Sequence, residues 1–271
     1  MHKISVVIIA YNEESRIRHT LESAKWCDEI IVIDSCSTDK TIEICKEYNN
    51  CKVYIQSFLG FGPQKRFGVD KAANDWILAI DADEVVSEAL KTEISNLLSS
   101  TTITKSGFYI PITMIFMNKV FNFGSENKQP HLRLFNKNNG NFNIRKLHEG
   151  VEIKGDVGKL KNEIMHCSYS NINHFFQKFN DYAEIYKIEA LKNNKQVGKL
   201  KPILRFPLEF IKQYFIRLNF LNGFPGFVWS FFGAFYVFVK YAKIYEANLP
   251  PTLPIRNPKS ETPHFSLPLQ N

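Results

Sequence analysis

Two carboxylates separated by one residue stand where they can share a divalent cation. Asp81 and Asp83 come directly after the apolar run Trp76–Ile80, which is typical of a buried strand. Carboxylate oxygens are ligands that Mg²⁺ and Mn²⁺ prefer, and a cation held there can neutralise charge on a departing diphosphate. Acidic turns after strands share this pattern, so the significance of the pair depends on its place in the fold.

Polar side chains also follow two other strand-like runs. Ile4–Ala10 is followed by Tyr11 and Glu13, and Glu29–Ile33 is followed by Asp34. Tyr11 can stack on a nucleobase, Glu13 can reach a ribose, and Asp34 can accept hydrogen bonds from either group. A solvated helix start for Glu13 and turn formation for Asp34 explain the same residues. Ligands of parallel sheets bind at the carboxyl ends of strands, so we expect these side chains and the acidic pair at one edge.

The first hundred residues alternate between strand-like and helix-like runs. Continuous apolar runs are typical of parallel strands covered on both faces, and the alternation predicts βαβ units in an α/β fold. We expect strands at residues 4–10, 29–33, 52–56 and 76–80. Helices are expected at residues 13–24, 63–73 and 87–98, and from Ser37 or Thr38, as the capping residue, through Tyr48.

The pattern changes after residue 106. Short strand candidates at residues 108–113, 132–135 and 151–153 are separated by Asn- and Gly-rich turns. They predict a mixed-sheet half that closes over a donor molecule bound at the parallel half and that shapes a pocket for an acceptor molecule. We therefore expect one domain over residues 1–170, with a donor half over about 1–105 and an acceptor half over about 106–170.

The last third of the chain is aromatic and helical in pattern. A helix is expected over residues 171–194, and its aromatic stripe favours packing (Phe175, Phe179, Tyr182 and Tyr186). No charged residue stands between Leu218 and Val239, which is long enough to cross a bilayer. However, Asn222–Gly226 breaks the run and leaves a shorter helix over about 227–245.

Lysine and arginine residues flank this aromatic helix on both sides. That arrangement favours an interfacial hairpin over a spanning helix or a merely buried one. We expect residues 171–249 to form a helical, membrane-associating region and residues 250–271 to form an irregular tail.

The formal net charge of +7 and the pI near 9.0 favour an anionic partner. No dense basic block stands in the first hundred residues, and positive charge rises around residues 187–217, beside the aromatic segment. This favours a membrane surface over nucleic acid. The five cysteines form no CxxC pair, and the first apolar run is too short for a secretory leader. We expect a cytoplasmic protein at the inner face of the cytoplasmic membrane.

Three blocks together resemble the inverting glycosyltransferases of family 2, in the usual order and separation: Val6–Glu14, Val32–Asp39 and Leu78–Glu84. The resemblance implies a GT-A fold with a Rossmann-like nucleotide-sugar-binding sheet and a divalent cation, Mg²⁺ or Mn²⁺. It places the donor against Ala10 and Tyr11. It also implies that Asp34 contacts the base, Asp81 the ribose and the metal, and Asp83 the metal.

A further segment, Gln64–Gly68, occupies the place where that family often has Ala-Arg-Asn-x-Gly. Lys65 replaces the usual arginine, and Arg66 follows it. Either cation can reach a phosphate or the base. Lysine, however, is a point charge, whereas arginine is a bidentate hydrogen-bond donor. The sequence leaves the choice between them open.

Two later blocks are similar to a subgroup that places glucose on the inner-core heptose of lipopolysaccharide, namely Pro130–Phe135 and Lys146–Gly150. The resemblance implies UDP-glucose as donor and a membrane glycolipid as acceptor. An inverting transfer needs one base. Glu149 is the candidate, with Asp156 as its substitute and His148 as a metal ligand or acceptor contact. Arg133 either steadies phosphate charge or pairs with a carboxylate.

Other functions fit the sequence less well. A polyprenyl-phosphate or other lipid-linked acceptor is the alternative within the same chemistry. A non-catalytic nucleotide-sugar or membrane-binding module is disfavoured because the acidic residues are all present. A nucleotidyltransferase would more often carry a Gly-rich basic loop after the first strand, and no GxGxxG follows that strand, which disfavours an NAD-dependent enzyme.

Overall fold

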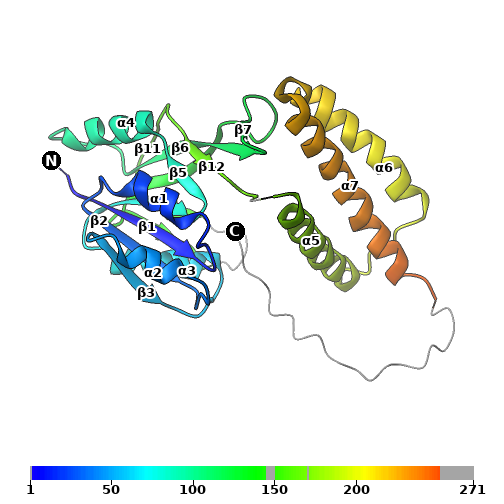
Figure 1. The fold of residues 1–271 in the computed structure, drawn as a ribbon, viewed down its shortest axis with the longest axis horizontal. Coiled ribbons are helices and arrows are strands. Elements are labelled where there is room, and N and C mark those ends of the chain that lie inside the picture. Colours follow the sequence, from blue (N-terminus) through cyan, green and yellow to red (C-terminus); the bar gives the residue numbers. More distant parts are fainter. Residues whose placement is uncertain (1, 145–149, 170, 251–271) are drawn as a thin grey trace. The chain divides into compact units, whose positions relative to one another are not determined.

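The computed structural model describes residues 2–144, 150–169 and 171–250. The chain forms two compact units. Unit 1 comprises the residues up to 114 together with residues 126–168, and unit 2 comprises residues 115–125 together with the described residues from 169 onward. Figure 1 labels their helices and strands.

The first half of unit 1 is a parallel sheet in the order β3-β2-β1-β4. Its strands are β1 (Ile4–Ala10), β2 (Glu29–Asp34), β3 (Cys51–Ile55) and β4 (Trp76–Asp81). All residues of β1, β2 and β4 are buried, as expected for strands covered on both faces. The predicted α/β fold is confirmed, and each of the four strands lies within one residue of its predicted bounds.

Alternate side chains of these strands enter two separate cores. Val6, Ile8 and Leu78 pack in one core with the helices α1 (Ile17–Ala24) and α4 (Glu88–Ser99). The opposite core contains their sequence neighbours, such as Val7, and the helix α3 (Phe61–Lys71). The period-two alternation of the strands thus distributes the helices over both faces.

Two helices begin later than the sequence predicts. The helix expected from Glu13 begins at Ile17, and the one expected from Ser37 or Thr38 is α2 (Thr41–Lys46). Instead of capping a helix, these residues join two loops: Ser37 Oγ accepts from Asn12 N at 2.8 Å, and Thr38 N donates to Asn12 Oδ1 at 2.8 Å. Side chains that satisfy backbone groups locally compete with helical turns.

The rest of unit 1 extends the sheet with both antiparallel and parallel pairs. β8 (Gln129–Asn136) pairs with β4 and with β6 (Gly107–Phe116). β12 (Ile164–His166) then joins β6 to β5 (Glu84–Val86), giving the order β4-β8-β6-β12-β5. This confirms the predicted mixed sheet. The short strands β5 and β12 were not predicted, and they contribute residues to the charged cluster described below.

Smaller strands complete the sheets. β11 (Val157–Lys159) pairs with β6. β10 (Val151–Ile153), which has its predicted bounds, pairs with β9 (Gly140–Phe142) in a separate two-stranded sheet. In unit 2, β7 (Lys119–Val120) pairs with the end of β6.

Unit 2 contains three long helices: α5 (Ile172–Lys192), α6 (Leu200–Ile211) and α7 (Gly223–Ala247). Between α6 and α7 lie a π-helical turn, η1 (Lys212–Ile216), and a 3₁₀ turn, η2 (Asn219–Asn222). In the aromatic stripe of α5, Phe175 and Phe179 are buried against α7, as the packing interpretation predicts.

Two details of unit 2 differ from the prediction. Tyr182 is 48% exposed, so the stripe is not buried along its whole length. The helix break lies before Gly223 rather than across 222–226, because Pro225 sits in the first turn of α7, where the missing N–H has no intrahelical acceptor.

Glu29 provides a stability test of the parallel sheet. Its carboxylate accepts from Ser5 Oγ at 2.7 Å and Ala73 N at 2.8 Å, and it pairs with Lys52 at 2.8 Å. Burial raises its pKa, but these partners outweigh burial and hold the pKa below its ordinary value. The stabilisation is therefore present above the pKa of the unfolded chain and is lost as the pH falls through the folded pKa.

We expect Glu29→Gln to lower the free energy of unfolding at neutral pH by about 1–3 kcal/mol, because hydrogen bonds to a charged group are lost. Urea unfolding as a function of pH measures this loss, which shrinks toward acidic pH. Glu47→Gln, in an exposed pair with Arg18, is the matched control. An equal loss in both variants would contradict the assignment.

Candidate functional site

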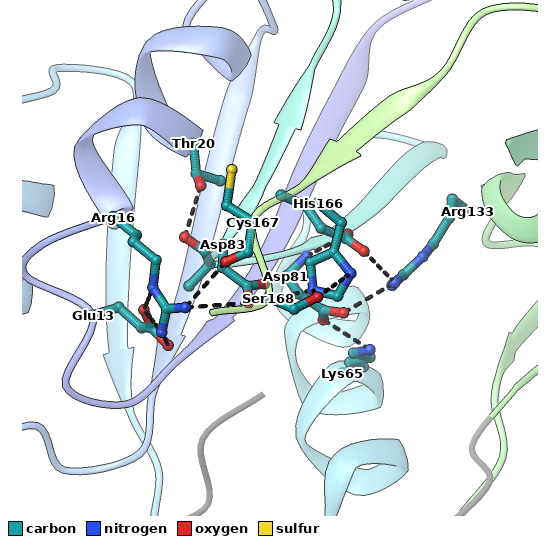
Figure 2. Close-up of polar contacts among 12 residues, drawn as sticks. Glu13, Arg16, Thr20, Lys65, Asp81, Asp83, Arg133, His166, Cys167 and Ser168 are labelled. Atoms are coloured by element: carbon teal, nitrogen blue, oxygen red, sulfur yellow. Dashed lines mark hydrogen bonds and ion pairs between the residues drawn. The ribbon is translucent and has the colours of Figure 1, made fainter. Parts of the chain in front are cut away.

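Charged side chains from several elements meet at the carboxyl edge of β4 (Figure 2). Asp81 ends β4, and Asp83 lies in the turn to β5. α3 contributes Lys65, β8 contributes Arg133 and β12 contributes His166. The acidic pair found in the sequence is thus the centre of a buried charged cluster.

Asp81 is held by two cations. Its Oδ1 lies 2.9 Å from Lys65 Nζ, and its Oδ2 lies 2.9 Å from Arg133 Nη2. Burial raises the pKa of Asp81, but the two neighbouring cations outweigh burial and hold this pKa well below its ordinary value. Asp81 is therefore ionised, and each of its oxygens is in an ion pair.

Glu84 closes the turn that carries the acidic pair. Its Oε2 accepts from Asp81 N at 2.8 Å, and its Oε1 lies 2.8 Å from Arg133 Nη2. Burial and the charge of Asp81 raise the pKa of Glu84, while Arg133 opposes them. Of the two roles left open for Arg133, the structure shows the pairing one, because its guanidinium bridges two carboxylates.

Asp83 has a different environment. Its Oδ2 lies 3.3 Å from His166 Nε2 and 3.6 Å from Arg16 Nη1. Its Oδ1 is buried and has no hydrogen-bond partner within the described part of the chain. Asp83 also lines a cavity of about 600 Å³ between α1 and β5, which Asp81 and Glu84 do not line. Asp81 Oδ1 also has no hydrogen-bond partner among the described residues, but it lies 2.9 Å from Lys65 Nζ, whereas Asp83 Oδ1 is in none of the ion pairs of the cluster.

His166 reaches Asp83 through strand pairing. β12 and β5 are antiparallel, with His166 opposite Glu84, and Cys167 N donates to Asp83 O at 3.0 Å. Burial lowers the pKa of His166, but the hydrogen bond to Asp83 and the nearby carboxylates outweigh burial and raise it. Sequence reasoning missed this residue; the only signal was a short apolar run, Ile164–Met165, that ends in a polar residue.

Glu13 is buried rather than exposed at a helix start. Its carboxylate accepts from Arg16 Nε at 2.7 Å and from Arg16 Nη2 at 2.9 Å, and its backbone N–H donates to Thr41 Oγ1 at 2.8 Å. Arg16 in turn donates to Cys167 O at 3.2 Å and approaches Asp83. The alternative of a solvated residue is therefore wrong, and the ribose contact stays a prediction.

The other predicted donor residues lie at the ends of β1 and β2. Asp34 is fully buried, and its two oxygens accept from Ser37 N at 2.7 Å and Ser37 Oγ at 2.5 Å. Turn formation by Asp34 is thus observed, and its contact with a base stays a prediction. Ala10 O accepts from Ser35 N at 2.8 Å, and Tyr11 is partly buried beside it.

Lys65 and Arg66, which the sequence could not separate, point to different places. Lys65 is buried against Asp81. Arg66 is exposed and donates to Phe142 O at 3.0 Å. Of these two residues, it is Lys65 that belongs to the charged cluster.

The structure describes one of the three predicted acceptor-side residues. His148 and Glu149 lie outside the described residues. Asp156, the substitute base, has a 79% exposed side chain that pairs with Lys105 at 3.1 Å. Its role stays a prediction.

Asp83 and His166 are the pair that could hold a divalent cation, because a free carboxylate oxygen and an imidazole are both ligands of Mn²⁺ or Mg²⁺. Among the described residues, no group of three His, Cys, Asp or Glu side chains forms a complete metal cage. A cation at this site therefore needs further ligands from a bound molecule, and phosphate oxygens are suitable.

Replacement of Arg133 tests the charged cluster. We expect Arg133→Met to lower the free energy of unfolding by about 3–5 kcal/mol, because two buried carboxylates lose their shared cation. The loss of the guanidinium raises the pKa of Glu84 further, so the deficit shrinks toward mildly acidic pH, where Glu84 takes up a proton. Denaturant unfolding at several pH values measures both effects.

Arg18→Met is the matched control, since Arg18 makes two hydrogen bonds of 2.7 and 2.8 Å to Glu47 at an exposed site. Solvent weakens such pairs, so the loss there should be much smaller. Equal losses in the two variants would contradict a special role for the buried cluster.

A family profile and a curated relative identify the family of this chain. The sequence profile of Glycosyl transferase family 2 matches residues 5–147. An uncharacterized glycosyltransferase of Rickettsia typhi is 34% identical over 92% of this chain and 89% of its own length. The lipopolysaccharide core biosynthesis glycosyltransferase LpsC of Rhizobium meliloti is 26% identical over 90% and 93%. The crystal structure of S. aureus TarS 1–349 in complex with UDP-GlcNAc matches with a TM-score of 0.47 and 16% identity, over 90% of this chain and 88% of that one.

Proposed function

The chain belongs to glycosyl transferase family 2 and is a glycosyltransferase, and we propose that it moves a hexose, glucose, from a UDP-sugar to a membrane glycolipid. The observation that supports this most is the edge of β4, where the family's acidic block is buried among cations and Asp83 keeps a free oxygen. The name of LpsC supports the lipopolysaccharide core as acceptor, and within it we propose the inner core.

We assign the divalent cation, Mn²⁺ or Mg²⁺, to Asp83 and His166. The residues fit such an ion, since Asp83 Oδ1 is an unsatisfied buried acceptor and His166 contacts the same carboxylate. When bound, the cation supplies a Lewis acid that neutralises charge on the departing nucleoside diphosphate. Asp81 was predicted to share this role. Its two ion pairs instead favour a role in holding Lys65 and Arg133 in place.

The donor lies, in this proposal, along the carboxyl ends of β1, β2 and β4. Tyr11 stacks on the uracil base. Asp34 keeps its hydrogen bonds within the turn, and that turn contacts the base. Glu13 approaches the ribose. Lys65 supplies positive charge toward the diphosphate from a fixed position, because Asp81 already orients its ammonium group. Such preorganised charge requires little rearrangement when the donor binds.

Glu149 acts as the base of the transfer. Its carboxylate takes the proton of the acceptor hydroxyl while that oxygen forms a bond to the anomeric carbon. The bond from that carbon to the diphosphate breaks on the opposite face, so UDP leaves and the configuration is inverted. Asp156, exposed and paired with Lys105, is the substitute.

Because the proposed acceptor is a membrane glycolipid, the reaction takes place at the cytoplasmic face of the cytoplasmic membrane. Residues 171–249 bind the protein to this membrane. In this proposal, residues 1–105 form the donor half and residues 106–170 the acceptor half. A polyprenyl-phosphate acceptor is the alternative that the transfer experiment below distinguishes.

Cation binding gives a test that is independent of turnover. We expect Asp83→Asn and His166→Ala each to weaken Mn²⁺ affinity by about 10–100-fold, because each variant removes a proposed ligand of the cation. Electron paramagnetic resonance of free Mn²⁺, titrated into purified protein with UDP, measures this. Asp70→Asn, at an exposed carboxylate bonded to Asn141, is the matched control. Unchanged affinity in both site variants would refute the assignment.

Transfer is tested with a panel of nucleotide sugars and core-truncated lipopolysaccharide. We expect acceptor-dependent UDP release from UDP-glucose, and a fall in kcat of about 10²–10⁴-fold in Glu149→Gln, because the base is lost. Donor affinity, measured by calorimetry, should remain. Glu152→Gln, at an exposed position of β10, is the control.

The outcomes separate the hypotheses. Release of UDP only with a polyprenyl-phosphate acceptor would replace the glycolipid assignment. A folded protein that binds UDP and Mn²⁺ but transfers nothing to either acceptor would favour the non-catalytic module.

A further inference from the structure

The helices α6 and α7 of unit 2 pack side by side (Figure 1). Many exposed apolar side chains lie on α6, on the turns that join it to α7, and on the beginning of α7. We call this group the hairpin surface. It consists of Leu200, Ile203, Leu204, Leu208, Ile211, Phe215, Ile216, Leu218, Phe220, Leu221, Phe224, Phe227 and Phe231, each at least 40% exposed. So many exposed large apolar side chains within 32 residues of the chain are unusual for a soluble surface and favour an interaction site.

The part of the hairpin surface on α6 follows helical spacing. Its exposed apolar residues recur at intervals of three and four along the helix, and they are Leu200, Ile203, Leu204, Leu208 and Ile211. Residues with this spacing lie on one side of a helix. Two other side chains of α6, Phe206 and Phe210, contact rings of α7 instead, with centroid distances of 5.7 and 5.9 Å. The helix therefore packs against α7 and still leaves an apolar stripe without a partner in the described part of the chain.

The charges around this stripe are mostly positive. Between residues 199 and 217 there are five basic residues (Lys199, Lys201, Arg205, Lys212 and Arg217) and one acidic residue, Glu209, so the segment carries a net charge of +4. An apolar helix face bordered by lysine and arginine is typical of a helix that lies in the interface of an anionic membrane. The charge therefore favours a lipid surface over an apolar protein partner.

Exposure along α7 is uneven. Residues Asn219–Ala247 are long and apolar enough to cross a membrane, with a mean hydropathy of 1.2. However, the exposed aromatic side chains of α7 are confined to its beginning, at Phe224, Phe227 and Phe231. From Phe232 to Tyr245 every residue is buried or partly buried, and Lys243 pairs with Glu184 of α5 at 3.1 Å. A spanning helix would need lipid-facing surface along its whole length, so this pattern favours shallow insertion of the turn.

Buried polar contacts hold the turn beneath these exposed side chains. Asn222 Nδ2 donates to Phe123 O at 3.0 Å, and Asn222 Oδ1 accepts from Asn122 N at 3.2 Å. Asn219 packs against Gly124, where a Cβ atom would lie 2.2 Å from Asn219 Oδ1. The segment 117–125 thus holds η2 in place through these contacts. The exposed apolar side chains therefore project from a turn whose backbone is fixed.

We propose that the hairpin surface inserts into the interface of an anionic lipid leaflet, with α6 lying along the membrane and the η1–η2 turn entering it, and that α7 does not span. This rests on the proposed function, which requires a membrane acceptor, and it specifies how the protein binds that membrane.

The test measures binding of the full chain to sedimenting vesicles of phosphatidylcholine, alone or mixed with phosphatidylglycerol, without nucleotide or sugar acceptor. We expect binding to the anionic vesicles, weakened by salt. Ile216→Glu with Phe224→Glu should lower the partition coefficient at least about ten-fold, because two inserted apolar side chains become charged. Ile55→Glu with Leu59→Glu, at exposed positions of unit 1, is matched in charge and should bind like the unaltered chain. Circular dichroism checks that both variants fold.

Three results would overturn the proposal. Equal binding by both double variants would show that the hairpin surface is not the contact. Resistance of the bound protein to alkaline carbonate would indicate a spanning α7. Self-association that the hairpin variant abolishes, without vesicle binding, would identify a second copy as the occupant. Because no substrate is present, vesicle binding without transferase activity would refute only the proposed function.

Discussion

Three carboxylates within four residues are buried at the end of β4, at positions 81, 83 and 84, and their mutual repulsion has to be balanced inside the fold. Each neighbouring element supplies one balancing group: Lys65 from α3, Arg133 from β8 and His166 from β12. Since buried charges are costly without partners, the acidic turn fixes where these elements can sit. The parallel and antiparallel halves of the sheet are thus joined electrostatically as well as by β-strand pairing.

The parallel half was predictable because its information is local. Runs such as Ile4–Ala10 are apolar throughout, and the residues that follow them are polar, so strand ends and fold class could be read directly. The starts of α1 and α2 could not be read in this way. Residues 12–14 form hydrogen bonds with residues 37–40, about 25 residues away in the sequence. The helix propensities of single residues carry no information about such long-range contacts.

The site was predictable in its acidic pair and not in its partners. His166 depends on the pairing of two three-residue strands some 80 residues apart, which no periodicity reveals. Lys65 and Arg66 are adjacent in sequence, and only the rotation of α3 sends one to Asp81 and the other to Phe142. In unit 2 the aromatic composition predicted helices, but the position of the turn depends on contacts of residues 219 and 222 with segment 117–125.

The bridging of Asp81 and Glu84 by Arg133 has a consequence for genetics. Substitutions at these three positions leave a buried charge uncompensated, and in a cell such chains are removed by proteases in proportion to their unfolded fraction. A screen for lost activity would therefore record them as essential through low protein abundance. Asp83 makes longer contacts with its cations, and its Oδ1 has no hydrogen-bond partner among the described residues, so a substitution there should remove chemistry with a smaller loss of protein.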